Sequence, residues 1–368
     1  MRVALVHDYL TQYGGAERVL EVLHERYPDA PVYTSLYDPN HLPDSFKSWD
    51  IRVSMLGSIP GSARTHRLWA PLYPAIFGHV GFHAIKDVDI VIADTSAWAH
   101  HTRPRHDVPV IGYCHSPARF LYGDPNYLGA ARIPAPLRPA SSGLFTALRW
   151  LDRRAAERLA HVVANSGAVR ERILNDWGVD STVIHPPVNI DRFRPAEPVD
   201  AEDWYLVVSR LVPHKWIDRA VRACTIANKR LKVIGSGRSE HALRRIAGPT
   251  IEFLGERSDA YVVDHMQRCR ALILPGIEDF GMTSIEAQAA GRPVIAARGG
   301  GALETVIENV TGLLFEPRND DELVGLLHHE QTWDSGVIQQ HTRQFGTDVF
   351  LEKMNTVVQD VLCEAARP

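Results

Sequence analysis

Cysteine is scarce in this sequence, long apolar runs are missing, and neither sign of charge dominates. The four cysteines among 368 residues, at positions 114, 224, 269 and 363, form no CxxC pair. This spacing argues against a disulfide framework or a structural zinc site and favours a reducing cytoplasm. No apolar run reaches the roughly 18 residues that a membrane-spanning helix needs. The net charge of −4 gives no general reason to expect nucleic acid as a partner.

Short apolar runs alternate with amphipathic stretches in the first half of the chain. Strand-like runs occupy residues 3–6, 89–94, 108–115 and 161–166, and helical spacing of apolar residues occupies 14–27 and 147–160. The run 3–6 is too short for a signal peptide, so we expect it to be the first strand. The alternation predicts a parallel sheet with helices on both faces.

The composition changes at residues 185–203, where four prolines and five acidic residues predict a linker. A second series of strand-like runs follows at 204–211, 231–237, 251–256, 271–276 and 292–301, and helical spacing returns at 347–366. The length exceeds one ordinary domain. We therefore predict an α/β fold with two doubly wound, Rossmann-like domains, 1–190 and 191–346, and a final helix within 347–368.

Charged residues follow the strands of the second series, where an open parallel sheet binds its ligands. Arg210 and Lys215 come directly after the run 204–211. A guanidinium binds two oxygens at once and an ammonium adds a compact charge, so the pair predicts a phosphate or diphosphate site. Two solvated surface cations are the alternative.

Glycines follow other strands of this series. Gly235 and Gly237 follow the run that begins at 231, and the three glycines 299–301 precede a helix expected near Ala302. A residue without Cβ lets the backbone approach a ligand closely, although a plain tight turn has the same composition.

The stretch PGIEDFGMTSIEA, residues 275–287, holds two glutamates eight positions apart. Gly281 and the two residues after it are expected to open a helix that runs to about Ala290, and a helix N-terminus favours phosphate or sugar oxygens. Glu278 precedes this helix and Glu286 lies on its second turn. The two carboxylates can accept hydroxyl hydrogen bonds from different parts of one ligand. The alternative is one acid at the helix dipole and one exposed acid.

Signals in the first domain are weaker. Gly14 and Gly15 stand at a helix start, where an oxyanion can bind. His115 ends a strand, so it either donates to a ligand hydroxyl near a reacting centre or is structural. Asp94, Ser96 and His100 also follow a strand, and we expect them to line the same edge.

Several patterns are typical of other chemistry, but their context in this sequence argues against each of them. Residues 279–281, Asp-Phe-Gly, look like a kinase triplet, but the other kinase motifs are not in order. Asp87 and Asp89 look like a metal-binding DxD pair, yet they precede their strand and so lie at the wrong edge for a ligand. The side chains of the adjacent pair His100 and His101 are expected to point apart. No metal site is therefore predicted.

The assembled order resembles glycosyltransferase family 4, whose members are retaining sugar transferases of the GT-B fold. The resemblance covers nearly the whole chain and is carried by Gly14-Gly15, His115, Asn165-Ser166, Arg210, Lys215, Gly235, Gly237, Glu278, Glu286 and GGGALETV at 299–306. It implies that the two domains face each other across a cleft, that no metal or other cofactor is needed, and that the final helix packs back on the first domain.

The resemblance also implies roles for single residues. Arg210 and Lys215 match the pair that holds the donor diphosphate, Glu278 the residue that binds the transferred sugar, and Glu286 the one that binds the ribose. The other expected donor contacts are Gly14, Gly15, Gly235, Gly237, Phe280, Gly281, Met282 and Thr283. His115 matches a histidine near the sugar and the reaction centre, and we expect it to contact the acceptor together with Asp94 and Ser96.

Three individual motifs resemble those of bacterial mannosyltransferases that build polysaccharides or O-antigens from GDP-mannose. YCHSPARFLY at 113–122, EDFGMTSIEA at 278–287 and GGALETV at 300–306 carry that likeness, whereas Trp216 departs from it. A glycan or lipid-linked acceptor is implied. A UDP-sugar transferase, a non-catalytic nucleotide-sugar-binding protein, and a GT-B epimerase or phosphorylase are the alternatives.

The segment 55–85 mixes basic residues with aromatic ones, among them Arg64, Arg67 and Trp69. Such a mixture can seat a segment on an anionic membrane surface, which favours a cytoplasmic protein with peripheral contact at the inner face of the membrane. A long loop and helix packed on the first domain is the equal alternative.

Overall fold

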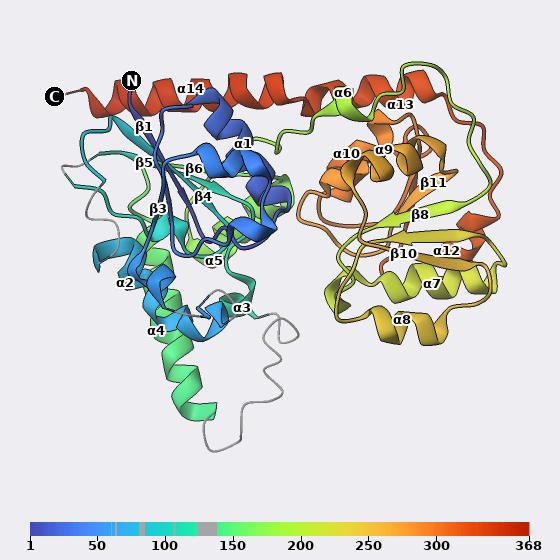
Figure 1. The fold of residues 1–368 in the computed structure, drawn as a ribbon, viewed down its shortest axis with the longest axis horizontal. Helices are drawn as coiled ribbons and strands as arrows, with labels where there is room; N and C mark the ends of the chain where they lie inside the picture. The colour runs from blue at the N-terminus through green and yellow to red at the C-terminus, as the bar shows by residue number, and fades with distance from the viewer. Residues whose placement is uncertain (60, 63–64, 81–84, 106–107, 124–137, 368) are drawn as a thin grey trace. The chain divides into compact units, whose positions relative to one another are not determined.

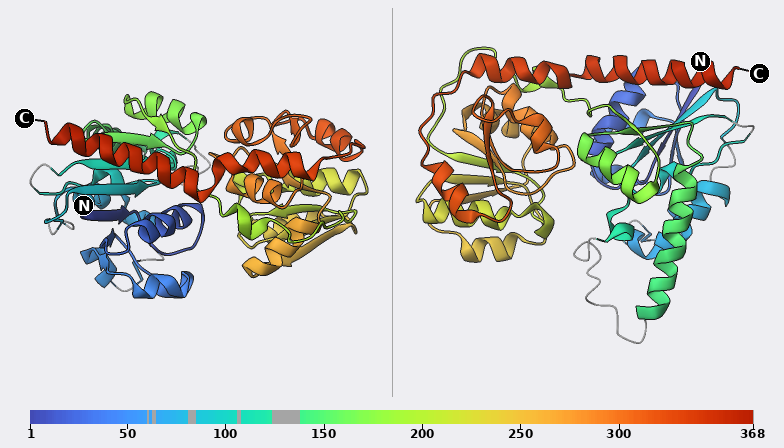
Figure 2. Two further views of the ribbon diagram at one scale, coloured as in Figure 1. Left: turned by 90° about the horizontal axis from the view of Figure 1, so that it is seen from above. Right: turned by 180° about the vertical axis from the view of Figure 1, so that it is seen from behind.

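The structure is a computed structural model that describes residues 1–59, 61–62, 65–80, 85–105, 108–123 and 138–367. The chain divides into two compact units (Figure 1). The first contains Met1–Pro187 and Phe350–Pro368, and the second contains Val188–Val349. The division falls at Pro187 and Val188, close to the expected boundary after residue 190. Both ends of the chain belong to the first unit (Figure 2).

The first unit has a seven-stranded parallel sheet in the order β3-β2-β1-β4-β5-β6-β7 among its described residues. The strands are β1 Val3–His7, β2 Val32–Thr34, β3 Ile51–Val53, β4 Ile90–Thr95, β5 Val110–Cys114, β6 His161–Ala164 and β7 Thr182–Val183. The strand order reverses between β1 and β4. In such sheets this switch point is where ligands bind, beyond the carboxyl ends of the strands.

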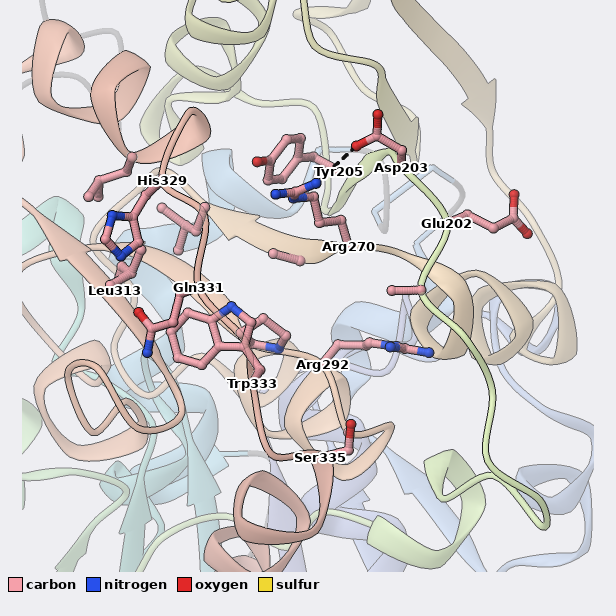
Figure 3. A pocket seen from close by; sticks show the side chains of 16 residues that line it. Glu202, Asp203, Tyr205, Arg270, Arg292, Leu313, His329, Gln331, Trp333 and Ser335 are labelled. Atoms are coloured by element: carbon pink, nitrogen blue, oxygen red, sulfur yellow. Dashed lines mark hydrogen bonds and ion pairs between the residues drawn. The ribbon is translucent and has the colours of Figure 1, made fainter.

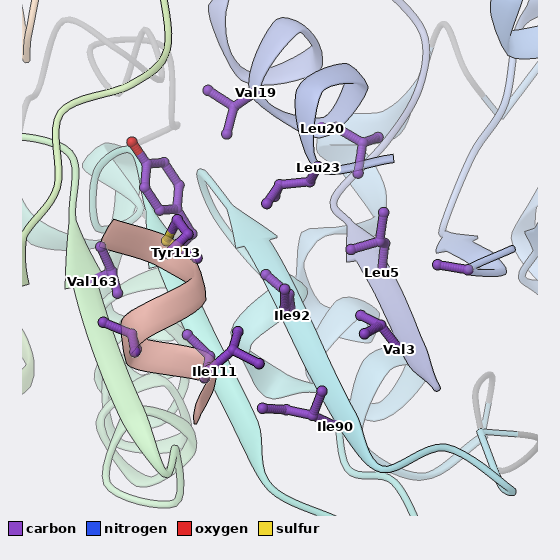
Figure 4. Packing of buried hydrophobic residues seen from close by; sticks show 14 of the residues in the cluster. Val3, Leu5, Val19, Leu20, Leu23, Ile90, Ile92, Ile111, Tyr113 and Val163 are labelled. Carbon is purple, nitrogen blue, oxygen red and sulfur yellow. The ribbon is translucent and has the colours of Figure 1, made fainter. Parts of the chain in front are cut away.

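Helices cover both faces of this sheet. They are α1 Gly15–Arg26, α2 Tyr73–Ala75, α3 Arg119–Tyr122, α4 Arg138–Ala156, α5 Gly167–Trp177 and most of α14 Thr347–Ala365. Side chains of β1 alternate between the two layers, as the strand period requires. Leu5 lies beside Leu20 and Leu23 of α1 (Figure 4) and Val3 belongs to the same cluster, whereas Val6 faces the other layer.

The second unit has a six-stranded parallel sheet in the order β10-β9-β8-β11-β12-β13. The strands are β8 Tyr205–Val208, β9 Leu231–Ile234, β10 Ile251–Gly255, β11 Ala271–Leu274, β12 Val294–Ala297 and β13 Gly312–Phe315. The strand order reverses between β8 and β11. Two Rossmann-like units with parallel sheets confirm the predicted fold class.

The helices of the second unit are α6 Ile190–Phe193, α7 Ile217–Ile226, α8 Glu240–Ile246, α9 Asp259–Arg268, α10 Met282–Ala289, α11 Ala302–Thr305, α12 Asp320–Leu327 and α13 Ser335–Thr342. Helix α10 begins where the sequence predicts, because Gly281 takes a left-handed conformation with φ 86° that few other residues adopt. Within the described ranges, no helix combines the length and the apolar character needed to cross a bilayer.

Candidate functional site

The loops after β8 and β9 touch each other through their backbones at the carboxyl edge of the second sheet. A Cβ on Gly235 would overlap the carbonyl oxygen of Ser209, and one on Gly237 would overlap that of Leu211. Both glycines also have positive φ, 130° and 155°. The contact between the two loops therefore explains why these positions are glycine. From the sequence alone, close approach of a ligand is the expected reason.

Lys215 and Glu278 form an ion pair beside the switch point of this sheet. Lys215 follows β8 and Glu278 follows β11, and the Nζ of Lys215 donates to Glu278 Oε2. The two side chains are only 21% and 16% exposed, so solvent screens the pair less than it would a surface pair. The loops that carry them are also close, since a Cβ on Gly276 would lie 2.8 Å from the Lys215 carbonyl oxygen.

The loop after β12 supports Glu278 from the other side. The backbone N–H of Gly301 donates to the Glu278 carbonyl oxygen at 3.0 Å. Gly300 has φ 57°, and a Cβ there would overlap that same carbonyl oxygen. The three glycines at 299–301 thus fix the backbone of the glutamate loop.

This support makes Gly300→Ala destabilising. The substitution adds a methyl group against the Glu278 carbonyl and imposes left-handed backbone strain, which together cost about 1–3 kcal/mol. Gly325→Ala is the matched control, because Gly325 is exposed in α12 with open space around its Cα, and alanine there stabilises a helix by about 0.5–1 kcal/mol. Urea unfolding of both variants measures the difference. Equal stability in Gly300→Ala and the unchanged protein would contradict this account of the loop.

Helix α10 places the remaining predicted donor residues. Glu286 lies on its second turn and is 6% exposed, while Met282 and Thr283 are half-buried at its start. Phe280 is 2% exposed and packs in a cluster with Ile285 and Phe345. The ring of Phe280 therefore serves the core of the unit, and only its backbone remains for a ligand, which narrows the predicted role.

Arg210 is exposed two residues beyond β8. The carboxyl edge of the second sheet thus collects two cations, two carboxylates and a helix N-terminus. Cations and helix N–H groups bind phosphate oxygens, and carboxylates accept hydrogen bonds from sugar hydroxyls. Glu278 Oε1 receives no hydrogen bond from the described residues, so one carboxylate oxygen stays available while Lys215 holds the other.

The switch point of the first sheet holds a chain of four ionisable side chains in contact with one another. His7 ends β1, and its Nδ1 lies 2.8 Å from Oδ2 of Asp94 on β4. The other oxygen of Asp94 lies 2.6 Å from Nε2 of His115, which follows β5. Nε2 of His7 lies 3.7 Å from Oε1 of Glu17 on α1. His7 and Glu17 are candidate residues that the sequence patterns do not single out.

Electrostatics fix the charges in this chain of residues. Burial alone would lower the pKa of His7, but its contacts with Asp94 and Glu17 outweigh burial and raise the pKa to about 10. Burial would raise the pKa of Asp94, but His115 and His7 outweigh it and lower the pKa. At neutral pH, His7 is therefore a cation and Asp94 a carboxylate.

Asp94 lies deeper than an acceptor contact requires, whereas the acceptor contact of the Ser96 side chain stays a prediction. Asp94 is fully buried and both of its oxygens are bound, so its side chain orients His115 instead of meeting a ligand. The backbone N–H of Ser96 donates to Asp8 at 2.6 Å, and Asp8 also accepts from the N–H groups of Trp98 and Ala99. Asp8 therefore holds the loop after β4 in place.

In the glycine loop after β1, one backbone N–H group already donates a hydrogen bond within the protein. The N–H of Gly14 donates to Glu17 Oε2 at 2.8 Å, which is the glutamate half of a capping box at the start of α1. Gly15 is exposed. A ligand oxyanion at this helix start would therefore meet the N–H groups that follow Gly14, with the Glu17 carboxylate already at Gly14 itself.

The side chains of His100 and His101 converge, which corrects the expectation that they point apart. Both lie on the short 3-10 helix Ala99–His101, and their Nε2 atoms are 3.0 and 3.1 Å from the same oxygen of Asp152. The other oxygen of Asp152 accepts from Tyr122 and Trp177 at 2.8 and 2.7 Å. These atoms are near enough for a metal. His101, Tyr122 and Trp177 already form hydrogen bonds with this carboxylate, whereas Nε2 of His100 lies close to it without one, so we interpret the cluster as a buried structural hub.

A pocket of about 340 Å³ lies at the opposite, amino edge of the second sheet (Figure 3). It is lined by residues that precede or begin β8, β11 and β12, such as Asp203, Arg270 and Arg292, and by Trp333 from the loop before α13. None of the predicted site residues lines it, and its charges are of both signs. It is therefore separate from the candidate site.

The predicted membrane segment 55–85 falls partly outside the described residues, and Arg64 is among those that lie outside them. In its described part, Met55 is 72% exposed and Leu72 is 47% exposed, whereas Tyr73 and Phe77 are buried in the core of the first unit. The packed half of the segment thus follows the structural alternative, and membrane contact stays a prediction.

Two family models match the chain. Residues 13–192 match "Glycosyltransferase Family 4", and residues 189–329 match "Glycosyl transferases group 1". An uncharacterized glycosyltransferase of Methanocaldococcus jannaschii is 35% identical over 32% of the chain and 35% of its own length. A GDP-mannose-dependent monoacylated alpha-(1-6)-phosphatidylinositol monomannoside mannosyltransferase of Corynebacterium glutamicum is 30% identical over 58% of the chain and 64% of its own length. The chain thus spans less than two thirds of each of these relatives.

Longer but weaker matches agree. Human alpha-1,3/1,6-mannosyltransferase ALG2 is 24% identical over 83% of the chain and 81% of its own length. Sucrose-phosphate synthase from Thermosynechococcus elongatus superimposes with a TM-score of 0.71 at 17% identity, over 99% of this chain and all of that one. HepE from Anabaena in complex with UDP gives 0.64 at 18% identity, over 98% of this chain and all of that one. The first unit is thus similar in sequence to family 4 glycosyltransferases and the second to group 1 glycosyltransferases, and the chain shares the two-domain fold of these solved structures.

Proposed function

We propose that the chain is a retaining hexosyltransferase that moves mannose from GDP-mannose to a glycan or lipid-linked acceptor in polysaccharide or glycolipid synthesis. The observation that carries the proposal is the Lys215–Glu278 ion pair at the switch point of the second sheet, beside Arg210 and the start of α10. This arrangement presents cations to a diphosphate and a carboxylate oxygen to a sugar. The GDP-mannose donor is supported by the name of the Corynebacterium relative.

The chemistry follows from these charges. Breaking the bond between the sugar carbon and the diphosphate leaves negative charge on the departing oxygen, and Arg210, Lys215 and the N–H groups of α10 stabilise that charge. The acceptor hydroxyl attacks the same face of the sugar carbon, and its proton passes to the departing diphosphate. Glu278 Oε1 orients the hexose and Glu286 the ribose. We expect no metal requirement, so transfer should persist in a chelator.

A UDP-sugar donor is the second candidate. The family match does not choose the base, and a solved structure of the same fold, HepE, holds UDP. Trp216 also bears on the choice of base. It stands where the resemblance predicts a small residue or arginine, and it adopts a left-handed conformation with φ 50° directly after Lys215.

Calorimetry with GDP and UDP, followed by transfer assays with GDP- and UDP-sugars, tests the donor. We expect GDP to bind at least about tenfold more tightly than UDP, which is about 1.4 kcal/mol, and GDP-mannose to be consumed fastest. Preference for UDP would replace the proposed donor. Binding of a nucleotide without turnover of any sugar nucleotide would favour the non-catalytic alternative.

A further inference from the structure

The contacts Glu17–His7–Asp94–His115 connect the Gly14 loop with His115. These two candidate site elements are far apart in the sequence. Glu17 holds the N–H of Gly14 through Oε2 and faces His7 through Oε1. Asp94 joins His7 to His115. His7, Glu17 and Asp94 are 2%, 3% and 0% exposed, whereas the side chain of His115 is 13% exposed. The exposed end of the chain of contacts is therefore His115.

The carboxylate decides which nitrogen of His115 carries hydrogen. An ionised carboxylate only accepts hydrogen bonds, so the 2.6 Å contact with Asp94 requires a hydrogen on Nε2 of His115. The described residues give Nδ1 of His115 no hydrogen bond. In its neutral form the ring thus offers the lone pair of Nδ1 to a ligand hydroxyl, and in its charged form it offers a second N–H.

His7 keeps Asp94 in the state that this arrangement needs. A buried carboxylate with a single neutral partner tends to take up a proton, because burial disfavours its charged form. The cationic ring of His7 at 2.8 Å opposes this, and Glu17 in turn compensates the charge of His7. The only charged groups that the described residues place against His7 are Glu17 from α1 and Asp94 from β4.

We propose that His7 is a positioning residue for the transfer reaction: through Asp94 it fixes the tautomer and the orientation of His115, and through Glu17 it ties that orientation to the Gly14 loop. The proposal rests on the proposed function for its kinetic consequences. Its structural content, the hydrogen on Nε2 of His115 and the doubly protonated ring of His7, can be tested without any measurement of activity.

The kinetic test uses His7→Gln in the full chain. Glutamine still offers an N–H to Asp94 but lacks the positive charge and the second contact to Glu17. We expect kcat to fall about 10- to 100-fold, as for a slightly misplaced reacting group, with the KM of the sugar nucleotide within about threefold. His24→Gln is the matched control, because His24 is another buried histidine of the first unit that stacks on Trp49 outside the network. It should leave kcat within about twofold of the unchanged protein.

The structural test is nitrogen NMR of histidine-labelled protein, with His115 assigned from His115→Gln. In the unchanged chain at pH 7.5, His115 should carry hydrogen on Nε2, and His7 should carry hydrogen on both nitrogens. In folded His7→Gln, the His115 signals should change. Hydrogen on Nδ1 alone of His115, a neutral His7, or an unchanged kcat in His7→Gln overturns the proposal. If no sugar nucleotide reacts even with the unchanged chain, the proposed function fails, and the NMR spectra still decide the role of His7.

Discussion

Lys215→Ala should reduce sugar transfer by about 100- to 1,000-fold, and Glu278→Gln should do the same. Removing one preorganised charged group from a largely buried site typically costs about 3–4 kcal/mol of transition-state stabilisation. Each substitution also leaves the other member of the pair without its ion-pair partner in a half-buried position. Initial rates at saturating sugar nucleotide and saturating acceptor measure the loss.

Two controls sharpen this test. Arg230→Ala removes an exposed cation of the same unit at the amino edge of β9, far from the loops that follow the strands, and should leave transfer unchanged. The double variant of Lys215 and Glu278 should lose little more than either single variant, because groups that act as one unit give non-additive losses. Full turnover in a correctly folded Lys215→Ala or Glu278→Gln protein would show that the catalytic centre lies elsewhere.

Asp152→Asn should cost about 3–5 kcal/mol of unfolding free energy, the usual effect of removing one charge from a buried ionic cluster. Burial would raise the pKa of Asp152, but its contacts with His100 and His101 outweigh burial and hold the pKa well below its usual range. The carboxylate is therefore charged at any pH where the protein is handled. An asparagine amide also turns a donor toward groups that themselves donate, the Tyr122 hydroxyl or the Trp177 indole.

Hydrogen exchange followed by mass spectrometry locates this effect. Peptides from α4 and α5 should exchange faster in Asp152→Asn, while peptides of the second unit stay unchanged. Asp180→Asn is the matched control: it removes an acid that pairs with Arg170 at the surface, at 76% and 52% exposure, and should change stability by less than about 0.5 kcal/mol. Equal exchange of α4 and α5 in both variants would contradict the interpretation of the Asp152 cluster as a structural hub.

The same cluster predicts a pH dependence. Burial, followed by the charge of His100, lowers the pKa of His101 to about 4. In the unfolded chain this histidine takes up a proton near its ordinary pKa of about 6.5. Between these two values the unfolded state binds more protons than the folded state, so the unfolding free energy of the first unit should fall as pH drops from 6.5 to 4. Stability that rises over this range would contradict a neutral, buried His101.

Local patterns in the sequence predict much of this fold. The start of α10 at Gly281, the strands β8 to β12 and the final helix follow from periodicity and glycine placement, which are local properties. The strands β2, β3, β7 and β13 are missed, and the first three have only two or three residues each, too few to show a period. The position of Glu278 and Glu286 on opposite sides of the α10 start also follows from local signals.

The contacts of the first unit are harder to predict, because they join residues far apart in the chain. His7 and Asp94 are 87 positions apart, and nothing near either of them indicates the other. The convergence of His100 and His101 depends on a 3-10 turn, in which adjacent side chains can reach one oxygen, and on Asp152 some fifty residues later. Sequence patterns locate the strand ends, whereas the sheet order decides which strand ends meet.

Helix α14 follows the second unit in the sequence, and this position has a consequence for folding during synthesis. Phe350, Met354 and Val358 of α14 lie in the same core cluster as Leu5 of β1. During synthesis on a ribosome the residues of the first unit emerge first, yet this core stays incomplete until the second unit has been made. The first unit is thus begun first and finished last. A nascent chain that stops before Phe350 leaves the apolar side chains of this cluster without their partners on α14, and we expect chaperones to bind them.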